Sequence, residues 1–189
     1  MPAWLVILIG YLLGSIPTAY IAGRVLKGQD IRHMGDENMG ALNAWRMLGH
    51  RAGLLVAIVD GLKGALAVLI AQGAHASQTV VMFTGTAAVI GHNWPVYIGF
   101  RGGRGAATAV GVLLVTVTRP VLILAGPAIL VLLIKKNTTP AFAVLFAPLW
   151  LVGWWAGIPG PLIIFSVALP CLVGLTHLIR AKPRVVRPA

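Results

Sequence analysis

Acidic residues and cysteines are scarce in this sequence. Only 4 of its 189 residues are Asp or Glu, and only 10% are charged at all. Soluble proteins carry about 25% charged residues, so this composition excludes an ordinary water-facing surface. The single cysteine, Cys171, rules out an internal disulfide and a cysteine-based metal cluster. Because the five histidines show no ligand spacing with one another or with the acids, we predict no metal site and no cofactor.

Apolar residues make up 58% of the chain, so lipid is the expected solvent. A helical crossing takes about 17–25 apolar residues, and the length leaves room for about five to seven crossings. We predict an all-α integral membrane protein that forms a single polytopic transmembrane domain over residues 1–189. The seven expected transmembrane helices lie near 3–23, 52–72, 79–98, 106–118, 120–134, 140–156 and 160–179.

The distribution of basic residues predicts the orientation of these helices. With the N-terminus outside and the C-terminus cytoplasmic, 13 of the 15 Lys and Arg residues fall on the inward side, including Lys182, Arg184 and Arg187. The exceptions are Arg119 at an outer turn and Lys63 within the second span. Such a bias is what orientation by flanking basic residues produces. The excess of positive charge therefore reflects membrane topology, and we predict no nucleic-acid partner.

The first inward loop, residues 27–46, holds three of the four acidic residues beside basic and amide side chains. Amide groups, exposed backbone N–H groups and guanidinium forks all suit a phosphate ligand. The candidate ligands are Asn38, Gly40, Asn43, Arg32 and Arg46. The alternative is that the acids of this loop pair with neighbouring arginines at the surface, which we favour for Asp30.

The second inward loop, residues 91–105, combines two arginines with closely spaced glycines just before an apolar helix. Such a loop can surround an anion with backbone N–H groups and add the positive end of the helix dipole. It could also be only a positive-inside anchor, but anchoring does not require glycine at 102, 103 and 105. The candidate residues are His92, Arg101, Gly102, Gly103 and Arg104.

Three polar features lie within or beside the predicted spans. Asp60 and Lys63 share a helix face and predict a structural ion pair, because isolated charges are costly in a membrane. Ser15 belongs to a Gly-Ser-Ile-Pro-Thr run that should kink the first helix. Thr138 and Thr139 follow two lysines at another inward helix end and could add hydroxyl groups to the same anion site.

The sequence has no Gly-x-Ser-x-Gly elbow and no His-x-x-x-x-Asp pair. Catalysis would then depend on placing two phosphate-bearing partners together and on stabilising the developing charge. Together, the polar segments resemble the bacterial acyl-phosphate:glycerol-3-phosphate acyltransferase family, called PlsY. The matching segments are Gly14-Ser15-Ile16-Pro17, Gly35-x-x-Asn38-x-Gly40-Ala41-x-Asn43-x-x-Arg46, Asp60-x-x-Lys63-Gly64, Gly91-His92-x-x-Pro95, Phe100-x-Gly102-Gly103-x-Gly105 and Thr138-Thr139.

The resemblance implies a seven-helix protein of the bacterial inner membrane with its active site facing the cytoplasm. It implies transfer of an acyl group from acyl phosphate to the 1-hydroxyl of glycerol 3-phosphate, which gives lysophosphatidic acid and phosphate at a lipid membrane. In the family mechanism a substrate phosphate accepts the proton. The resemblance assigns catalysis to Ser15, Arg46, His92 and Arg104. It assigns substrate binding to Asn38, Gly40, Asn43, Arg101, Gly102, Gly103, Thr138, Thr139 and His177.

Three departures from the family pattern keep other functions open. Asp36 and Glu37 replace a serine and a glycine, Arg104 replaces a lysine, and a C-terminal motif with an asparagine and an acid is not recognisable after His177. A non-catalytic or altered-acceptor relative that binds a phosphate-bearing lipid precursor is therefore the second hypothesis. A small anion transporter ranks last, because few polar residues interrupt the spans.

Overall fold

The computed structural model describes residues 1–180, and every regular element in this part of the chain is helical. The elements are α1 (Ala3–Gly14), α2 (Thr18–Lys27), η1 (Ile31–His33), α3 (Ala41–Leu48), α4 (His50–Gly73), α5 (Gln78–Asn93), η2 (Val96–Ile98), α6 (Ala106–Thr116), α7 (Thr118–Lys135), α8 (Thr138–Phe146), α9 (Leu149–Trp155) and α10 (Gly160–Ile179). The predicted inward residues Lys182, Arg184 and Arg187 lie outside the described residues.

Within residues 1–180, five helical stretches are long and apolar enough to cross a membrane. They are Ala3–Lys27, His50–Gly73, Thr118–Lys135, Thr138–Trp155 and Gly160–Ile179, and α6 is a shorter apolar helix. Many large apolar side chains on these helices point outward, such as Leu54, Leu62 and Leu69 along α4. An apolar exterior is expected where lipid replaces water, and the chain is a multi-pass membrane protein.

Prolines divide or shorten three of the predicted spans. The first is interrupted between α1 and α2 at Pro17, as the Gly-Ser-Ile-Pro-Thr run predicted, and the sixth is interrupted between α8 and α9 at Pro148. The third was predicted to reach residue 98, but α5 ends at Asn93, two residues before Pro95. That prediction was wrong at its end, because the residue before a proline disfavours helix and proline itself has no N–H to donate.

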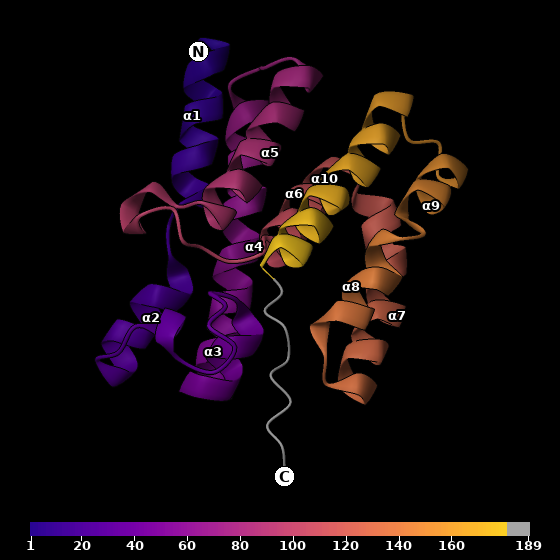
Figure 1. The fold of residues 1–189 in the computed structure, drawn as a ribbon. Helices are drawn as coiled ribbons and strands as arrows, with labels where there is room; N and C mark the ends of the chain where they lie inside the picture. The colour runs from indigo at the N-terminus through magenta and orange to yellow at the C-terminus, as the bar shows by residue number, and fades with distance from the viewer. Residues whose placement is uncertain (181–189) are drawn as a thin grey trace.

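Glycines allow two pairs of helices to touch along their backbones. A side chain at Gly14 of α1 would overlap the Ala88 carbonyl group of α5, and one at Gly111 of α6 would overlap the Gly61 carbonyl oxygen of α4. Close backbone approach through small residues is the usual means of packing helices in lipid, where apolar side chains gain little from burial. Figure 1 shows α1, α4 and α5 running side by side.

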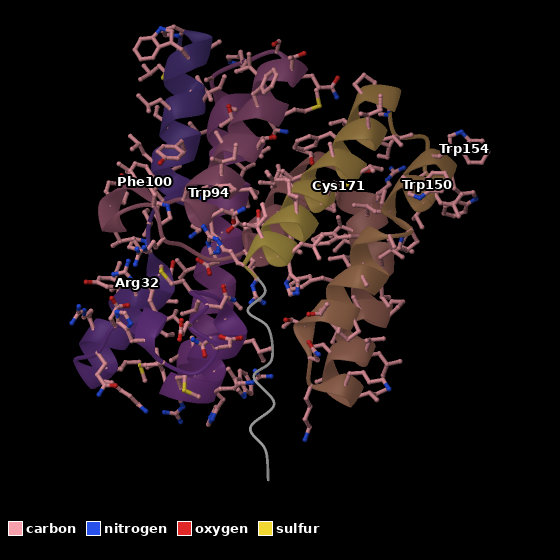
Figure 2. The ribbon with its side chains drawn as sticks, viewed as in Figure 1. Arg32, Trp94, Phe100, Trp150, Trp154 and Cys171 are labelled. Atoms are coloured by element: carbon pink, nitrogen blue, oxygen red, sulfur yellow. The ribbon has the colours of Figure 1, made fainter. Side chains whose placement is uncertain are left out.

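On the other side of α10, α7, α8 and α9 complete the bundle, and α7 packs against α8 (Figure 1). The main apolar core extends through both parts and includes Val68 of α4, Val112 of α6 and Leu169 of α10. Trp150 and Trp154 of α9 are exposed and point away from the bundle (Figure 2). Tryptophans at helix ends of this kind form the aromatic belts of membrane interfaces.

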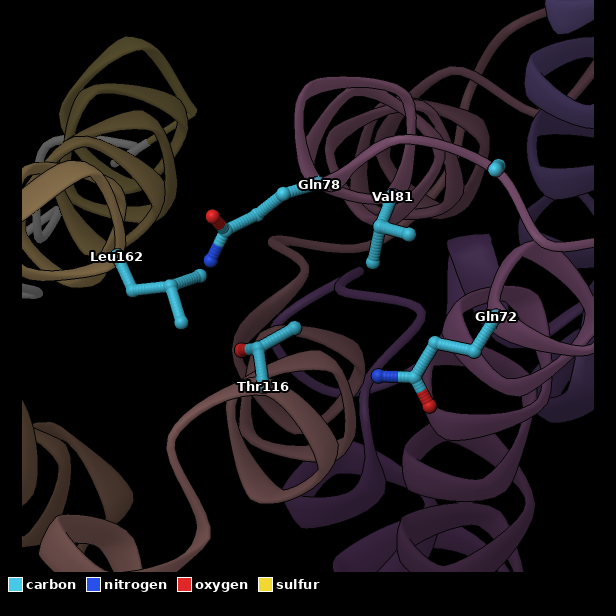
Figure 3. Close-up of a pocket in the computed structure, with 6 residues that line it drawn as sticks. Gln72, Gln78, Val81, Thr116 and Leu162 are labelled. Carbon is cyan, nitrogen blue, oxygen red and sulfur yellow. The ribbon is translucent and has the colours of Figure 1, made fainter. Parts of the chain in front are cut away.

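The helix ends form two contrasting regions. At one end, a pocket of about 280 Å³ is lined by residues near the end of α4 and α6 and the start of α5 and α10 (Figure 3). Its lining is Gln72, Ala76, Gln78, Val81, Thr116 and Leu162. No predicted site residue is among them. The first predicted loop lies between α2 and α3, and the second joins the opposite ends of α5 and α6.

We expect Gly14→Ala to destabilise the protein by about 1–3 kcal/mol, because the added methyl group must push α1 away from α5. Thermal unfolding in detergent measures the effect. Gly126→Ala is the matched control, since Gly126 lies in α7 with open space around it. A melting temperature for Gly14→Ala equal to that of the control would contradict the close packing of α1 on α5.

Candidate active site

The buried amide of Asn43 shapes the first loop. Its Nδ2 donates to the carbonyl oxygens of Met34 at 2.9 Å and Asn38 at 3.0 Å, and its Oδ1 accepts from the Asp36 backbone N–H at 3.3 Å. These contacts use both N–H groups of the amide and its carbonyl oxygen. Gly40 is the N-cap of α3, and Asn38 is half-buried beside it. Asn43 therefore holds the loop in shape from inside α3.

Asp30 and Arg32 form the surface pair that we favoured for Asp30. The Arg32 Nη2 lies 2.7 Å from the Asp30 Oδ2, and the hydrogen bonds from Arg32 lower the pKa of the Asp30 carboxyl. Arg32 Nη1 also donates to the Ile98 carbonyl oxygen at 2.9 Å, which ties the first loop to the second. Arg32 is thus engaged away from Asp36, whose Oδ1 accepts from the Asn38 backbone N–H at 3.2 Å.

The second loop folds back onto the end of α5. The Gly102 N–H donates to the Asn93 carbonyl oxygen and the Gly103 N–H donates to the His92 carbonyl oxygen, each at 3.1 Å. A side chain at Gly103 would overlap the His92 ring and lie 3.0 Å from the Met39 carbonyl oxygen of the first loop. Glycine is therefore required here by close approach. The expectation that these two N–H groups face an anion was wrong, because both bind α5.

The end of α10 is hydrogen-bonded to the same loop through Arg180. Sequence reasoning did not anticipate this contact. Arg180 Nη1 donates to the carbonyl oxygens of Gly102 and Gly103, and its Nη2 donates to that of Asn93, each at 2.6 Å. Its guanidinium group lies 5.4 Å from the centre of the Trp94 ring. Burial, and to a lesser degree the neighbouring Arg104 charge, lower the pKa of Arg180.

Arg104 and His177 contact each other beside the hydrogen bonds of Arg180. Arg104 Nη1 lies 3.3 Å from His177 Nδ1, so the guanidinium group donates to the imidazole. Arg104 Nε is buried and has no hydrogen-bond partner among residues 1–180. The buried Asn93 donates through Nδ2 to the Thr176 hydroxyl at 3.0 Å, one residue before His177. The structure thus leaves a half-buried guanidinium group with donor capacity for a ligand.

A buried ion pair between Asp60 and Lys63 lies behind His92. Lys63 Nζ is 2.8 Å from Asp60 Oδ1, which confirms the predicted ion pair, and it donates to the Ile16 carbonyl oxygen at 3.0 Å. His92 Nδ1 lies 3.6 Å from the same carboxylate oxygen. The opposite ring nitrogen, Nε2, is the atom nearest to Gly103. Asp60 therefore faces one side of the imidazole while the loop faces the other, a contact that spacing alone did not reveal.

The other predicted residues are more scattered. Ser15 is fully buried against Gly91, and its hydroxyl donates to the Tyr11 carbonyl oxygen at 2.8 Å. Arg46 on α3 and Arg101 are exposed. Thr138 and Thr139 lie in the first turn of α8, where the Asn137 side chain accepts from the Thr139 N–H. The structure therefore brings together only part of the predicted set: His92, Gly102, Gly103, Arg104 and His177.

Comparison with known proteins identifies the family. The family model for glycerol-3-phosphate acyltransferase matches residues 4–184. Glycerol-3-phosphate acyltransferase 4 of Dehalococcoides mccartyi is 52% identical over 178 residues, which cover 94% of this chain and 96% of that protein. The chain belongs to the glycerol-3-phosphate acyltransferase family. Glycerol-3-phosphate acyltransferase 1 of the same organism is 38% identical and covers 97% of this chain and 91% of its own length.

Solved structures agree with this membership. The crystal structure of PlsY, an integral membrane glycerol 3-phosphate acyltransferase, in its glycerol 3-phosphate form has a TM-score of 0.85 at 33% identity, over 94% of this chain and 88% of that one. The lysophosphatidic acid form of PlsY has a TM-score of 0.80 at 32% identity, over 93% and 87% of the two chains. The resemblance predicted from the sequence is confirmed, and this chain is an acyltransferase.

Replacing Asp60 with Asn should destabilise this acyltransferase by about 3–5 kcal/mol, because it leaves the Lys63 charge buried without its partner. The double variant Asp60→Asn/Lys63→Met should recover much of the loss, since no buried charge then remains. Thermal unfolding in detergent compares the two with the unmodified protein. If the double variant were no more stable than Asp60→Asn, burial of the Lys63 charge would not be the cause.

Proposed function

We propose that this acyltransferase moves the acyl group of an acyl phosphate to the 1-hydroxyl of glycerol 3-phosphate, with lysophosphatidic acid and inorganic phosphate as products. The observation that carries the proposal is the buried Arg104 Nε that has no partner among residues 1–180, beside His177 and the loop of residues 102–105. A guanidinium group held in this way suits a phosphate monoester. The glycerol 3-phosphate and lysophosphatidic acid forms of PlsY, which correspond to the proposed acceptor and product, also support it.

The reaction needs positioning more than a strong base. Acyl phosphate is a mixed anhydride, so attack by the 1-hydroxyl forms the new C–O ester bond as the bond to the phosphate oxygen breaks. The hydroxyl proton passes to a substrate phosphate, and the products are an ester and hydrogen phosphate. Arg104 and His177 hold a phosphate and stabilise its charge in this scheme. His92 presents Nε2 to the same loop, with Asp60 behind it.

The remaining predicted residues have supporting roles in the proposal. Asn43 keeps the Asn38–Gly40 segment in shape, and Ser15 packs against the start of the His92 loop. Arg46, Arg101, Thr138 and Thr139 would complete the phosphate contacts. Arg46, Arg101 and Thr139 are exposed and Thr138 is half-buried, so these side chains are accessible to a charged substrate that arrives from water.

An apolar groove between α2 and α4 suits the acyl chain. It has a volume of about 310 Å³, and its walls include Ile21, Val25, Leu55 and Val59. Its lining includes Ile16, whose carbonyl oxygen accepts from Lys63. A lipid chain in this groove would therefore lie next to the Asp60–Lys63 ion pair behind His92. The membrane supplies this donor and takes up the product, both of which carry a long apolar chain.

We also propose seven membrane crossings in the bacterial inner membrane, with the N-terminus outside and the active site facing the cytoplasm. The crossings are α1–α2, α4, α5, α6, α7, α8–α9 and α10. In Figure 1, α2, α3 and the turn between α7 and α8 lie at the same end of the bundle. Arg24, Lys27, Lys135 and Lys136 belong to these segments, so the positive-inside rule supports a cytoplasmic location for that end.

Cysteine labelling checks this orientation. In a Cys171→Ser background, a membrane-impermeant maleimide added to right-side-out vesicles should label Ser77→Cys, which precedes α5. It should label Gln29→Cys, which follows α2, only after the membrane is permeabilised. Both positions are exposed in the structure, so access depends on the side of the membrane. The reverse pattern would place the proposed active site outside the cell.

Arg104→Ala should lower kcat/KM by about a hundredfold or more, because a preorganised charge at the reacting phosphate is lost. Arg104→Lys should retain part of the activity, since the charge remains but the fork does not. The assay measures phosphate release from palmitoyl phosphate by the purified protein, with and without glycerol 3-phosphate, and uses acyl-CoA as a control donor.

Arg51→Ala serves as the matched control, because Arg51 is exposed at the start of α4 and is not part of the proposed site. Acceptor-dependent release from acyl phosphate, without transfer from acyl-CoA, would support the proposed reaction. Folded protein that releases no phosphate in the presence of glycerol 3-phosphate would instead support an altered acceptor or a non-catalytic relative.

A further inference from the structure

We infer that Arg180 is a positioning residue, which holds the anion-binding loop closed from the end of α10 without contacting the substrate. The inference rests on the proposed function for its effect on turnover. It concerns a side chain that lies beyond the motifs of the first two loops and for which sequence reasoning predicted only an inward location. Its three acceptors are backbone carbonyl oxygens where α5 meets the second loop, and its aromatic neighbour, Trp94, directly follows α5.

The junction between the end of α5 and the second loop contains backbone carbonyl groups that need hydrogen-bond donors. Asn93 is the last residue of α5, and carbonyl groups in the last turn of a helix have no partner within the helix. A positive charge at this end also stabilises the helix dipole. Arg180 Nη2 meets the Asn93 oxygen at 2.6 Å, while the Gly102 N–H meets the same oxygen at 3.1 Å. One acceptor therefore joins α5, the loop and α10.

Gly102 and Gly103 have no side chains with which to hold this part of the loop in shape. Gly102 and Gly103 must be glycine because side chains there would overlap the carbonyl group and the ring of His92. Arg180 Nη1 supplies the missing support by donating to both of their carbonyl oxygens at 2.6 Å. The planar guanidinium fork can make these contacts simultaneously, which an ammonium group cannot do with the same geometry.

The residues at the end of α10 connect the hydrogen bonds of Arg180 to Arg104, the residue proposed to bind phosphate. Arg180 follows Thr176 by four residues and His177 by three, so it lies close to both at this end of the helix. Thr176 accepts from Asn93, His177 accepts from Arg104, and Arg180 holds the two residues that precede Arg104. Loss of Arg180 should therefore release the loop and displace Arg104 from His177.

The test uses the full-length protein in detergent with Arg180→Ala and Arg180→Lys, and with Arg51→Ala as the matched loss of a positive charge. We expect Arg180→Ala to lower kcat/KM about tenfold to a hundredfold, as the loss of charge-assisted hydrogen bonds implies, and Arg180→Lys to retain an intermediate value. Millimolar guanidinium ion should restore part of the activity of Arg180→Ala, whereas a variant with a general packing defect would not respond.

Hydrogen–deuterium exchange without substrate gives a second readout. In Arg180→Ala, exchange should rise in the peptide that contains residues 99–105 and should stay unchanged in α1 and α4. Unchanged exchange in the loop would overturn the positioning role, whether or not activity falls, because Arg180 would then act elsewhere. Wild-type kcat/KM in Arg180→Ala would also overturn it.

The two proposals fail in different ways. If the unmodified protein shows no acyl transfer, the proposed function fails. Hydrogen–deuterium exchange of residues 99–105 in Arg180→Ala then still decides whether Arg180 holds the loop. If the unmodified protein is active but Arg180→Ala matches it in both turnover and exchange, only the positioning role fails.

Discussion

Lipid provides no hydrogen-bond partners, and this constraint explains most of the polar contacts in the structure. Inside the bundle, Asp60 and Lys63 neutralise each other, and Lys63 also donates to the Ile16 carbonyl oxygen, at the break in the first span before Pro17. The Thr84 hydroxyl donates to a carbonyl oxygen of its own helix. Each group is satisfied locally, so the helices can pack through glycine. Among residues 1–180 the buried Arg104 Nε lacks a hydrogen-bond partner, and it lies where the proposed phosphate ligand binds.

How much the sequence could predict depends on the range of each interaction. The break at Pro17 and the pairing of Asp60 with Lys63 follow from neighbours along the chain, and both were predicted correctly. The contact between His92 and Asp60 joins α5 to α4, and the contact of Arg180 joins α10 to α5. No spacing rule within one helix reports such contacts. The N–H groups of Gly102 and Gly103 were expected near an anion, but their partners lie nine and eleven residues earlier, at the end of α5.

The first loop shows how a changed motif can keep its shape. Asp36 and Glu37 stand where the family pattern has a serine and a glycine, and the sequence suggested that their charges oppose phosphate. In the structure Asp36 accepts a hydrogen bond from the backbone two residues later, and its own N–H is held by Asn43. The carboxylate thus takes part in a tight turn at an exposed position. The loop shape depends mainly on Asn43, which the departure from the family pattern leaves intact.

Arg104 and Arg180 lie near each other, and their positive charges repel. Their different partners explain how the fold accommodates both. Arg180 is surrounded by three carbonyl oxygens and an aromatic face, which stabilise its charge without an acid. Burial and the nearby Arg104 nevertheless lower its pKa, so the pair carries unfavourable electrostatic energy. A phosphate between the loop and His177 would relieve that repulsion, because it attracts both guanidinium groups. Substrate binding would then reduce an electrostatic cost that folding alone leaves in place, which favours occupancy of this site over any position on the apolar exterior.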